Sequence, residues 1–319
     1  MEPQKQKSIL TFLTRIVKGI PIGVAFIIPG FSGGSVAAIL GIYDELLEAI
    51  TGILKHFGKS LAFLIPILLG MLIGAGALLF PLRWGLSRYP IVVASLFIGL
   101  AIGGLPSITS HIKGKWSVGN VFAFLLPLVI TAAIGFIPAG KEVDLMNVDF
   151  IGYVLLFLVG LLGAAALVVP GISGSMLLLI LGYYNPILGM LTDHLLKGDM
   201  VFHSLTVIVC VGLGIAVGFF LISLIMKTLL RKYPKGTYIA IVGFIIGSVP
   251  AVYLASCKDV GMTLATLGEW MSPLLWVFAA IFLAVGFAAS FCFVKYMAKT
   301  ESADKADTEA QLEESESKE

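Results

Sequence analysis

The sequence predicts an all-α polytopic membrane protein built from two internal repeats, and three observations support this prediction. Of the 319 residues, 58% are hydrophobic and only 13% are charged, and the mean hydropathy is +1.02; these values exclude an ordinary soluble domain. Apolar runs near the roughly 20 residues needed to cross a bilayer recur along the chain. A 22-residue stretch also occurs twice: between Pro29–Ile50 and Pro170–Leu191, nine of 22 positions are identical without a gap.

The two ends of the chain differ in charge. Residues 1–18 are basic and partly amphipathic, and we expect a helix at the membrane surface; Arg15 and Lys18 interrupt its apolar run, which is not typical of a cleaved signal peptide. The tail 301–319 has eight acids and two lysines and lacks aromatic residues, so we expect it to be disordered. Residues 1–300 then carry a net charge of +8. That surplus suits a cytoplasmic face near anionic lipid, and no basic stripe indicates a nucleic-acid partner.

Each copy of the repeated stretch predicts a re-entrant hairpin made of two half-helices. The Pro-Gly-x-Ser-Gly sequence would break a helix, and the run after it is strongly helical. An unwound turn inside a membrane is tolerated only where protein or water, and not lipid, satisfies its backbone. We place the hairpins at about 19–50 and 150–192.

Three apolar spans follow each hairpin, so each half is a hairpin plus three membrane helices. The first set is expected at about 61–82, 90–106 and 120–138, and the second at about 203–230, 237–256 and 273–296. A polar link separates membrane repeat 1 (19–140) from membrane repeat 2 (150–298). Residues 83–106 match residues 227–250 at a constant offset of 144, which indicates a duplication. Paired Gly-x-x-x-Gly sequences at 99–103 and 243–247 are interpreted as helix packing.

The orientation of the halves depends on whether the hairpin returns to its starting side. If it does, the halves are inverted, with 14 basic residues inside and five outside up to residue 300; otherwise they are parallel, with 13 inside and six outside. The positive-inside rule barely separates these arrangements. About 33 mostly helical residues measure about 50 Å, which exceeds one crossing of a core of about 30 Å. We therefore favour inverted repeats, with both termini in the cytoplasm.

The two Ser-Gly turns are the candidate binding site, because paired broken helices in two halves indicate a transporter's substrate site. A half-helix that starts at such a turn leaves N–H groups unpaired, and glycines and serine hydroxyls favour the approach of a phosphate or a carboxylate. The alternative is that the small residues only allow tight helix packing. The candidate residues are Pro29, Gly30, Ser32, Gly33, Gly34, Ser35, Pro170, Gly171, Ser173, Gly174 and Ser175.

Two further sets of charged residues are candidates. Arg83 and Arg88 lie at a span end, where a guanidinium suits phosphate but is also an ordinary interface anchor. Asp44 follows the first turn and is a candidate for proton coupling; the alternative is that it marks the hairpin's return to water. Asn185 stands at the equivalent place in the second half, so such a role would be one-sided.

Catalytic and metal sites are not predicted. Residues 30–34 fit the G-x-S-x-G nucleophile pattern, but a serine hydrolase needs a histidine base beside Ser32. The second copy breaks the pattern, and His56, His111, His194 and His203 all lie in or beside predicted links. The histidines have no metal-ligand spacing, and three single cysteines give neither a disulfide framework nor a CxxC pair. We expect no cofactor, no metal and no enzyme activity.

The two motifs, PGFSGGSVAAILGIYDELLEAI and PGISGSMLLLILGYYNPILGML, resemble the bacterial polyprenyl-phosphate transporter family long catalogued as domain of unknown function 368. In that family each half carries Pro-Gly-(aliphatic)-Ser-Gly-Gly/Ser and then Leu/Thr-Gly-x-Tyr. The resemblance covers roughly residues 15–298. It implies inverted repeats with two re-entrant hairpins in the bacterial cytoplasmic membrane, and the return of undecaprenyl phosphate from the outer to the inner leaflet. Phe31 and Asn185 depart from the family's usual residues.

The resulting hypothesis is a flippase with undecaprenyl phosphate and membrane lipids as partners. The two turns would hold the phosphate headgroup while the isoprenoid stays in lipid, and the halves would rock to expose the site alternately. Arg83 or Arg88 would capture the phosphate on the outer side, and a proton or sodium is the candidate coupling ion. A polyprenyl-pyrophosphate phosphatase, a small-anion transporter and a non-transporting scaffold remain alternatives, and the sequence does not indicate the oligomeric state.

Overall fold

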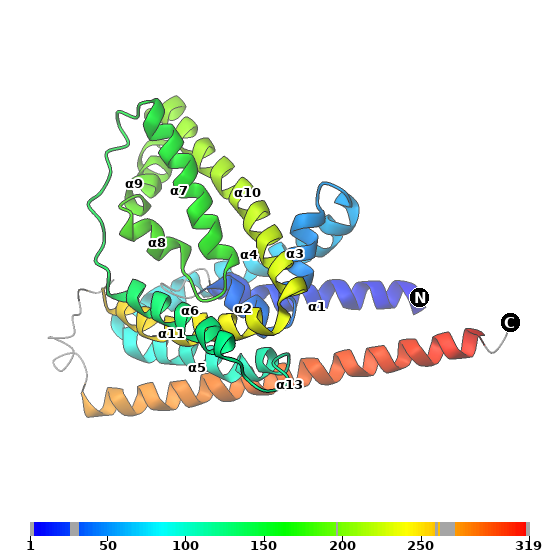
Figure 1. The fold of residues 1–319 in the computed structure, drawn as a ribbon. Coiled ribbons are helices and arrows are strands. Elements are labelled where there is room, and N and C mark those ends of the chain that lie inside the picture. The colour runs from blue at the N-terminus through cyan, green and yellow to red at the C-terminus, as the bar shows by residue number, and fades with distance from the viewer. Residues whose placement is uncertain (1–2, 26–31, 196, 259–260, 262–271, 317–319) are drawn as a thin grey trace.

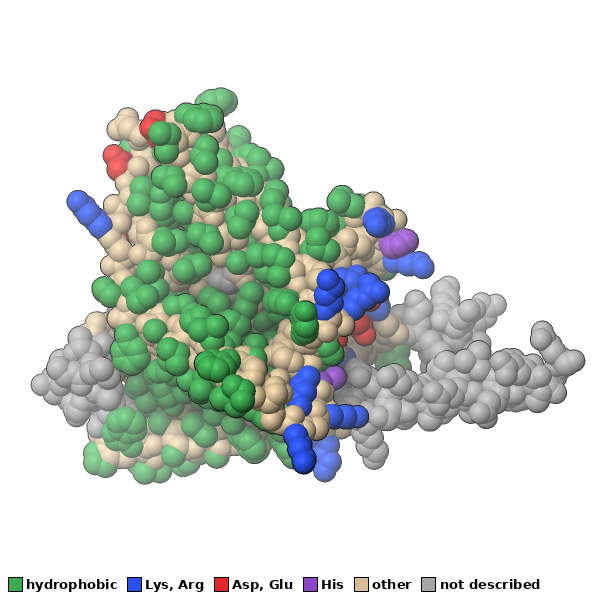
Figure 2. All heavy atoms as spheres, in the orientation of Figure 1, with side chains coloured by type: hydrophobic (Ala, Val, Ile, Leu, Met, Phe, Trp, Pro, Cys, Tyr) green, Lys and Arg blue, Asp and Glu red, His purple; other side chains and the backbone are tan. Residues whose placement is uncertain are grey.

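The computed structural model describes residues 3–25, 32–195, 197–258, 261 and 272–316, and no strand occurs among them (Figure 1). Six helices in these ranges are long and apolar enough to cross a bilayer, and they lie within a few residues of the predicted spans. Figure 2 shows hydrophobic side chains spread widely over the visible face, while charged side chains gather in a few places, as expected for contact with lipid. The prediction of an all-α, multi-pass membrane protein is confirmed.

The helices follow one another in the same order in the two parts of the chain. The first part contains α1 (Pro3–Ala25), α2 (Gly33–Ile39), α3 (Tyr43–Gly52), α4 (Phe57–Arg88), α5 (Pro90–Thr109) and α6 (Val118–Phe136). The second contains α7 (Phe150–Val168), α8 (Gly174–Ile180), α9 (Tyr184–Gly189), the π-helix η1 (Met190–Leu195), α10 (Val201–Lys232), α11 (Pro234–Lys258) and α13 (Pro273–Glu316). This order is the one that a duplication requires. The duplication itself and the inverted orientation of the halves stay predictions.

The two ends of the chain differ from their predicted boundaries. α1 is one continuous helix across residue 18, where we expected the surface helix to end and the first hairpin to begin. α13 continues to Glu316, so the acidic tail extends a helix in this structure where we expected disorder. The tail contains no glycine or proline and is rich in Glu and Ala. These residues have high helix propensity, and low hydrophobicity by itself does not reveal that propensity.

Each predicted hairpin contains one more break than we expected. The half-helix after the first Ser-Gly turn was expected to run to Ile50, but it is divided into α2 and α3. The break is a Schellman cap: Gly41 has a φ of 68°, its N–H donates to the carbonyl of Ala38, and the next N–H donates to Ala37. Gly182, with a φ of 78°, ends α8 in the same way, and the helices around it are bent by 109°. A Leu-Gly pair before a tyrosine was the sequence signal for both breaks.

Close helix pairs hold the molecule together. α1 packs along α4, α7 along α10, α5 along α13 and α6 along α11, while α5 and α11 also meet. Figure 1 shows α13 lying along α5. Gly99 and Gly103 of α5 lie so close to the backbone of α13 at Leu283 and Phe287 that a Cβ would clash. The glycines of the 243–247 motif approach α6 in the same way, so the interpretation of both motifs as packing sites is confirmed.

The core surrounds the first hairpin, whereas the second hairpin lies at its edge. All seven residues of α2 are buried, and the main core cluster joins α1, α2, α3, α4 and α5 to parts of α7, α10 and α11. In α8, by contrast, only Gly174 and Met176 are buried. The two copies of the motif therefore have unequal surroundings.

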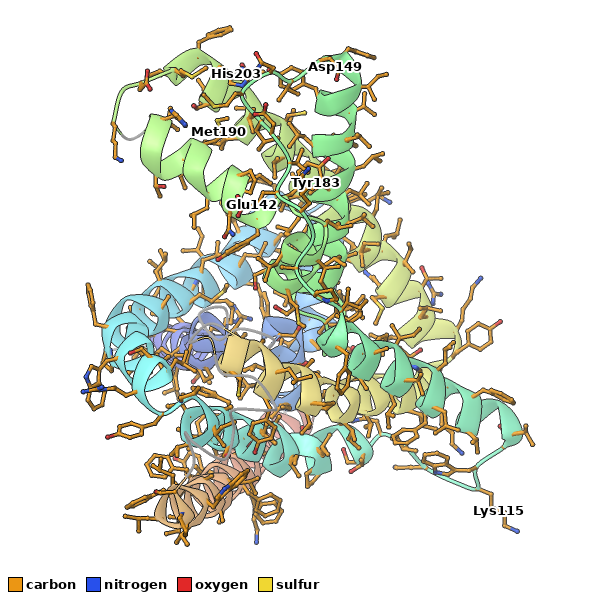
Figure 3. All side chains as sticks on the ribbon, turned by 90° about the vertical axis from the view of Figure 1, so that its left-hand side faces the viewer. Lys115, Glu142, Asp149, Tyr183, Met190 and His203 are labelled. Atoms are coloured by element: carbon orange, nitrogen blue, oxygen red, sulfur yellow. The ribbon has the colours of Figure 1, made fainter. Side chains whose placement is uncertain are left out.

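The second hairpin is covered by the link between the halves, residues 137–149. Val143 N–H donates to the carbonyl of Gly182, and the Asn185 amide donates to Glu142 over 2.8 Å. At the far end of the link, a ring nitrogen of His203 lies 2.7 Å from the carbonyl of Leu145. Figure 3 shows Glu142 and Tyr183 along this contact and His203 near the end of the link. The link ties the second hairpin to α10.

Candidate functional site

The two Ser-Gly turns meet where the halves join. The Ser32 hydroxyl of the first turn donates to the carbonyl of Val169, over 3.5 Å, and Val169 directly precedes Pro170 of the second turn. The Tyr43 hydroxyl donates to the neighbouring carbonyl of Val168 over 2.9 Å. Ser32 and Tyr43 are both buried. Two residues of the first motif thus hold the end of the helix that leads into the second motif.

These carbonyls are available because α7 ends at Val168. Pro170 has no N–H, and Gly171 has a φ of 87°, so the chain leaves the helix and the last carbonyls have no partner within it. Gly171 also lies against the backbone of Phe244 in α11, where a Cβ would clash. The hydroxyls of the first hairpin satisfy the acceptors that this turn leaves open.

The two turns differ in how their own helices are capped. Ser32 has an extended backbone, and its side chain makes no cap bond to α2. The first hydrogen bond of that helix runs from Val36 N–H to the Ser32 carbonyl. The N–H groups of residues 33–35 come before it and therefore have no acceptor within the helix. In the second turn the Ser173 hydroxyl accepts from Met176 N–H over 3.5 Å and lies 3.1 Å from the Ser175 hydroxyl. The second turn caps itself, whereas the first does not.

An apolar cavity of about 440 Å³ lies beside the first turn. The backbones of Gly33 and Gly34 form part of its wall. Tyr43 and Val168 also line it, so the cavity borders the contact of Ser32 and Tyr43 with Val169 and Val168, which we call the joint between the halves. Apolar side chains of α1, α3, α4 and α10 complete the wall. The cavity has the chemistry of a hydrocarbon site with main-chain amides at one place.

The matches to known proteins cover this whole region. A sequence model of the undecaprenyl phosphate translocase-like family matches residues 22–267, which include both turns and every helix from α2 to α11. This chain belongs to that family. The family resemblance that the two motifs indicated is thereby confirmed.

Two curated relatives are named polyprenyl-phosphate transporters. The protein of Staphylococcus aureus is 29% identical over 294 residues, which are 90% of this chain and 97% of that protein. The protein of Vibrio cholerae is 29% identical over 267 residues, which are 76% of this chain and 78% of that protein. No solved structure matches the chain.

In this member of the undecaprenyl phosphate translocase-like family, the predicted binding residues are only partly brought together. Ser32, Gly33, Gly34 and Ser35 lie at the buried start of α2. The second-turn residues lie across the joint, where Pro170, Gly171, Ser173 and Gly174 are buried and Ser175 is half-buried. Pro29 and Gly30 lie outside the described residues.

The other predicted residues lie away from the turns. Arg88 is exposed at the end of α4, and the side chain of Arg83 lies outside the described part of the structure. Among the α4 residues that line the cavity, Met71 is the nearest to Arg88 in sequence. The two are 17 residues apart on the helix, or about 26 Å at 1.5 Å per residue, so Arg88 lies far from the cavity. Asp44 is exposed on α3 and accepts a hydrogen bond from the Tyr238 hydroxyl over 3.0 Å.

Sequence reasoning missed Tyr43 as a residue of the joint. Tyr43 is the tyrosine of the first Leu-Gly-x-Tyr motif, and the motif recurs in the second copy. This recurrence indicated that the tyrosine has a role, but it did not indicate which group the hydroxyl binds. Its counterpart Tyr184 is exposed, so only the first tyrosine enters the core. The hydrolase alternative gains no support, because the Ser32 hydroxyl donates to a carbonyl, and His194 and His203 have partners elsewhere.

Proposed function

We propose that this chain moves a polyprenyl phosphate between the two leaflets of a membrane, with the phosphate held at the joint between the turns. The family and the names of both relatives support this substrate class. The observation that carries the geometric part is the apolar cavity beside the Gly33 and Gly34 backbones, with walls from both halves. The proposal places the molecule in the bacterial cytoplasmic membrane with both termini in the cytoplasm.

The position of the headgroup follows from the difference between lipid and phosphate. Lipid tails are about as apolar as leucine, so an apolar cavity holds an isoprenoid chain with little preference over the bilayer. The phosphate carries between one and two negative charges, and one charge at the bilayer centre costs several kcal/mol. The start of α2 borders the cavity, and its N–H groups, together with the hydroxyls of Ser32 and Ser35, are the donors that would replace water. Binding energy thus comes from the phosphate end.

Movement between leaflets requires the joint to open. In this conformation the Ser32 and Tyr43 hydroxyls are engaged by the Val169 and Val168 carbonyls. A phosphate oxygen is a stronger acceptor than a carbonyl, because hydrogen bonds to charged groups are roughly twice as strong as neutral ones. We propose that the headgroup takes the Ser32 hydroxyl from Val169 and so weakens the contact between the halves. That exchange would couple binding to alternating access.

A liposome assay tests the proposal directly. Purified protein is placed in vesicles with undecaprenyl phosphate, and headgroup accessibility to a phosphatase added outside is followed over time. We expect a Ser32→Ala/Ser173→Ala variant to move the lipid about tenfold more slowly than wild type, because two donors to the charged group are lost. A Ser87→Ala/Ser110→Ala variant is the matched control, since both of these serines are exposed and bond only to residues nearby in sequence, far from the turns.

The outcomes separate the remaining alternatives. Equal rates in wild type and the Ser32/Ser173 variant, or no movement above empty vesicles, would contradict the proposal. A polyprenyl-pyrophosphate phosphatase would release inorganic phosphate from its lipid substrate without the added enzyme. A small-anion transporter would move labelled phosphate into vesicles that contain no polyprenyl lipid.

A further inference from the structure

A second, polar pocket of about 210 Å³ lies between α3 and the C-terminal end of α10. Its lining consists of Asp44, Leu47 and Glu48 from α3 and Lys227, Leu230 and Arg231 from α10. Figure 2 shows Lys and Arg side chains gathered on the side of the molecule where these two helix segments meet. One water takes up roughly 30 Å³ in the liquid, so the pocket has room for a phosphate group with part of its hydration.

α3 separates this pocket from the apolar cavity. Tyr43 and Leu46 face the cavity, Asp44 and Glu48 face the polar pocket, and Leu47 borders both. Leu47 is only 1% exposed, so its buried side chain lies between the two spaces as part of the wall that α3 forms. A lipid whose tail occupies the cavity therefore has a polar pocket within one helix width of it.

The two cations of the pocket are only weakly engaged by protein groups. Lys227 Nζ lies 3.9 Å from Glu48 Oε1 and donates to the Thr51 hydroxyl over 3.4 Å. The Lys227 side chain is 40% exposed and that of Glu48 is 69% exposed, and ion pairs this open to solvent contribute little to stability. Arg231 is exposed and has no hydrogen-bond or ion-pair partner among the described residues. Asp44 is already engaged by the Tyr238 hydroxyl, over 3.0 Å.

The sequence repeat gives an independent reason to consider this place. At the constant offset of 144, Lys227 stands at the position of Arg83, which the sequence singled out as a candidate phosphate contact at a span end. Lys227 and Arg231 are four residues apart, so they share one face of α10. A phosphate placed between them can accept a bidentate pair of hydrogen bonds from the guanidinium and one from the ammonium.

We propose that Lys227 and Arg231 form a second binding site for a phosphate monoester, next to the apolar cavity, with Glu48 as the counter-ion that the phosphate displaces. The proposal rests on the function proposed above for the identity of the natural occupant, the headgroup of a polyprenyl phosphate. Leu47 separates this site from the turns, so the headgroup occupies it before entering the joint or after leaving it. Free phosphate has the same chemistry and is the competing occupant.

Binding to the full-length protein in lipid nanodiscs tests the site. The probe is radiolabelled farnesyl phosphate, with farnesol, inorganic phosphate and empty nanodiscs as comparison arms. A Lys227→Gln/Arg231→Gln variant is expected to raise the Kd about tenfold, because charge-assisted hydrogen bonds are lost. Lys232→Gln is the matched control: it removes the next charge on α10 but lies outside the pocket lining, and it should change the Kd by less than about twofold.

The direction in which Glu48→Gln changes the Kd is the decisive result. If Glu48 competes with phosphate for Lys227, its loss lowers the Kd several-fold, an improvement that misfolding cannot produce. If Lys227 and Glu48 only support each other structurally, both variants weaken binding, and that result overturns the proposal. So does an unchanged Kd in the Lys227/Arg231 variant.

The comparison arms identify the occupant and separate this inference from the proposed function. Competition by farnesyl phosphate but not by inorganic phosphate supports the site and assigns it to the lipid headgroup. Equal competition by inorganic phosphate supports the site and assigns it to free phosphate. Equal competition by farnesol contradicts it. Wild-type lipid movement in liposomes together with an unchanged Kd in the variant refutes the second site alone, whereas absence of both binding and movement in wild type refutes the proposed function as well.

Discussion

At the scale of single residues, two hydroxyl groups of the first hairpin bond to the end of α7, where the second turn begins. The Tyr43 hydroxyl bonds to Val168 within the buried core, and the Ser32 hydroxyl bonds to Val169 at the turn. A motif search identifies both residues, but it cannot identify their acceptors, because a carbonyl becomes available only where α7 ends. The acceptors were created by Pro170 and Gly171, which the sequence did reveal.

Replacement of Tyr43 by phenylalanine should weaken this joint. The substitution leaves the buried Val168 carbonyl without its partner, which costs about 1–3 kcal/mol. We expect a lower midpoint of thermal unfolding in detergent and an altered rate of lipid movement. Tyr184→Phe is the matched control, because this tyrosine holds the same motif position and is exposed. Similar shifts for the two variants would argue against a role of the Tyr43 hydroxyl in the joint.

Two glycines should respond differently to alanine. Gly41 and Gly171 both have a positive φ, and a Cβ at Gly41 would meet nothing within 4 Å, whereas one at Gly171 would overlap the Phe244 backbone. Gly41→Ala should therefore cost about 1–2 kcal/mol, the backbone strain alone. Gly171→Ala should cost clearly more, or prevent folding. Thermal unfolding and the yield of monodisperse protein measure the difference, and equal losses would show that the approach to Phe244 is unimportant.

At the scale of elements, the long spans and the starts of the short helices after both turns could be predicted, whereas the ends of those short helices could not. The six spans follow from length and hydropathy, since about 20 apolar residues suffice for a crossing. The division of each hairpin into three helices depends on Gly41 and Gly182, which end α2 and α8 by Schellman caps. Hydropathy does not change at these two glycines, so a prediction based on apolar runs does not detect that a helix ends there. The unequal burial of α2 and α8 depends on the tertiary fold and has no local signal.

Filling the apolar cavity should slow lipid movement without unfolding the protein. Ala216 of α10 lies in the cavity wall, and Ala216→Phe would take up part of its volume of about 440 Å³. Val217→Phe is the control on the same helix, because Val217 is exposed and does not line the cavity. We expect about a tenfold slower rate for the first variant and an unchanged rate for the second, measured in the liposome assay. If both variants move lipid at the wild-type rate, the cavity is not on the path.

At the scale of the whole molecule, the orientation of the halves is the largest question that the sequence left open. The charge counts differ by one residue between the inverted and the parallel arrangement, and helix packing does not define a membrane side. The link 137–149 decides between them: it lies outside the cell if the halves are inverted and inside if they are parallel, given a cytoplasmic N-terminus.

Labelling of the link tests the orientation. Asn147 is exposed in the link, so Asn147→Cys in a background without the three native cysteines presents one accessible thiol. The inverted arrangement predicts labelling of intact cells by a membrane-impermeant maleimide. A cysteine in the loop between α5 and α6, for example at Lys113, should be labelled only after permeabilisation. The reverse pattern would establish parallel halves.

The pairing of the last helices has a consequence for how the chain assembles. α6 packs chiefly against α11, and α13 against α5, so each half of the polypeptide ends in a helix whose main neighbour belongs to the other half. A gene cut within the link would yield two fragments, and neither alone could bury its final helix. Made together in one cell they should associate into a working complex, and made separately each should be degraded by the cell's membrane proteases.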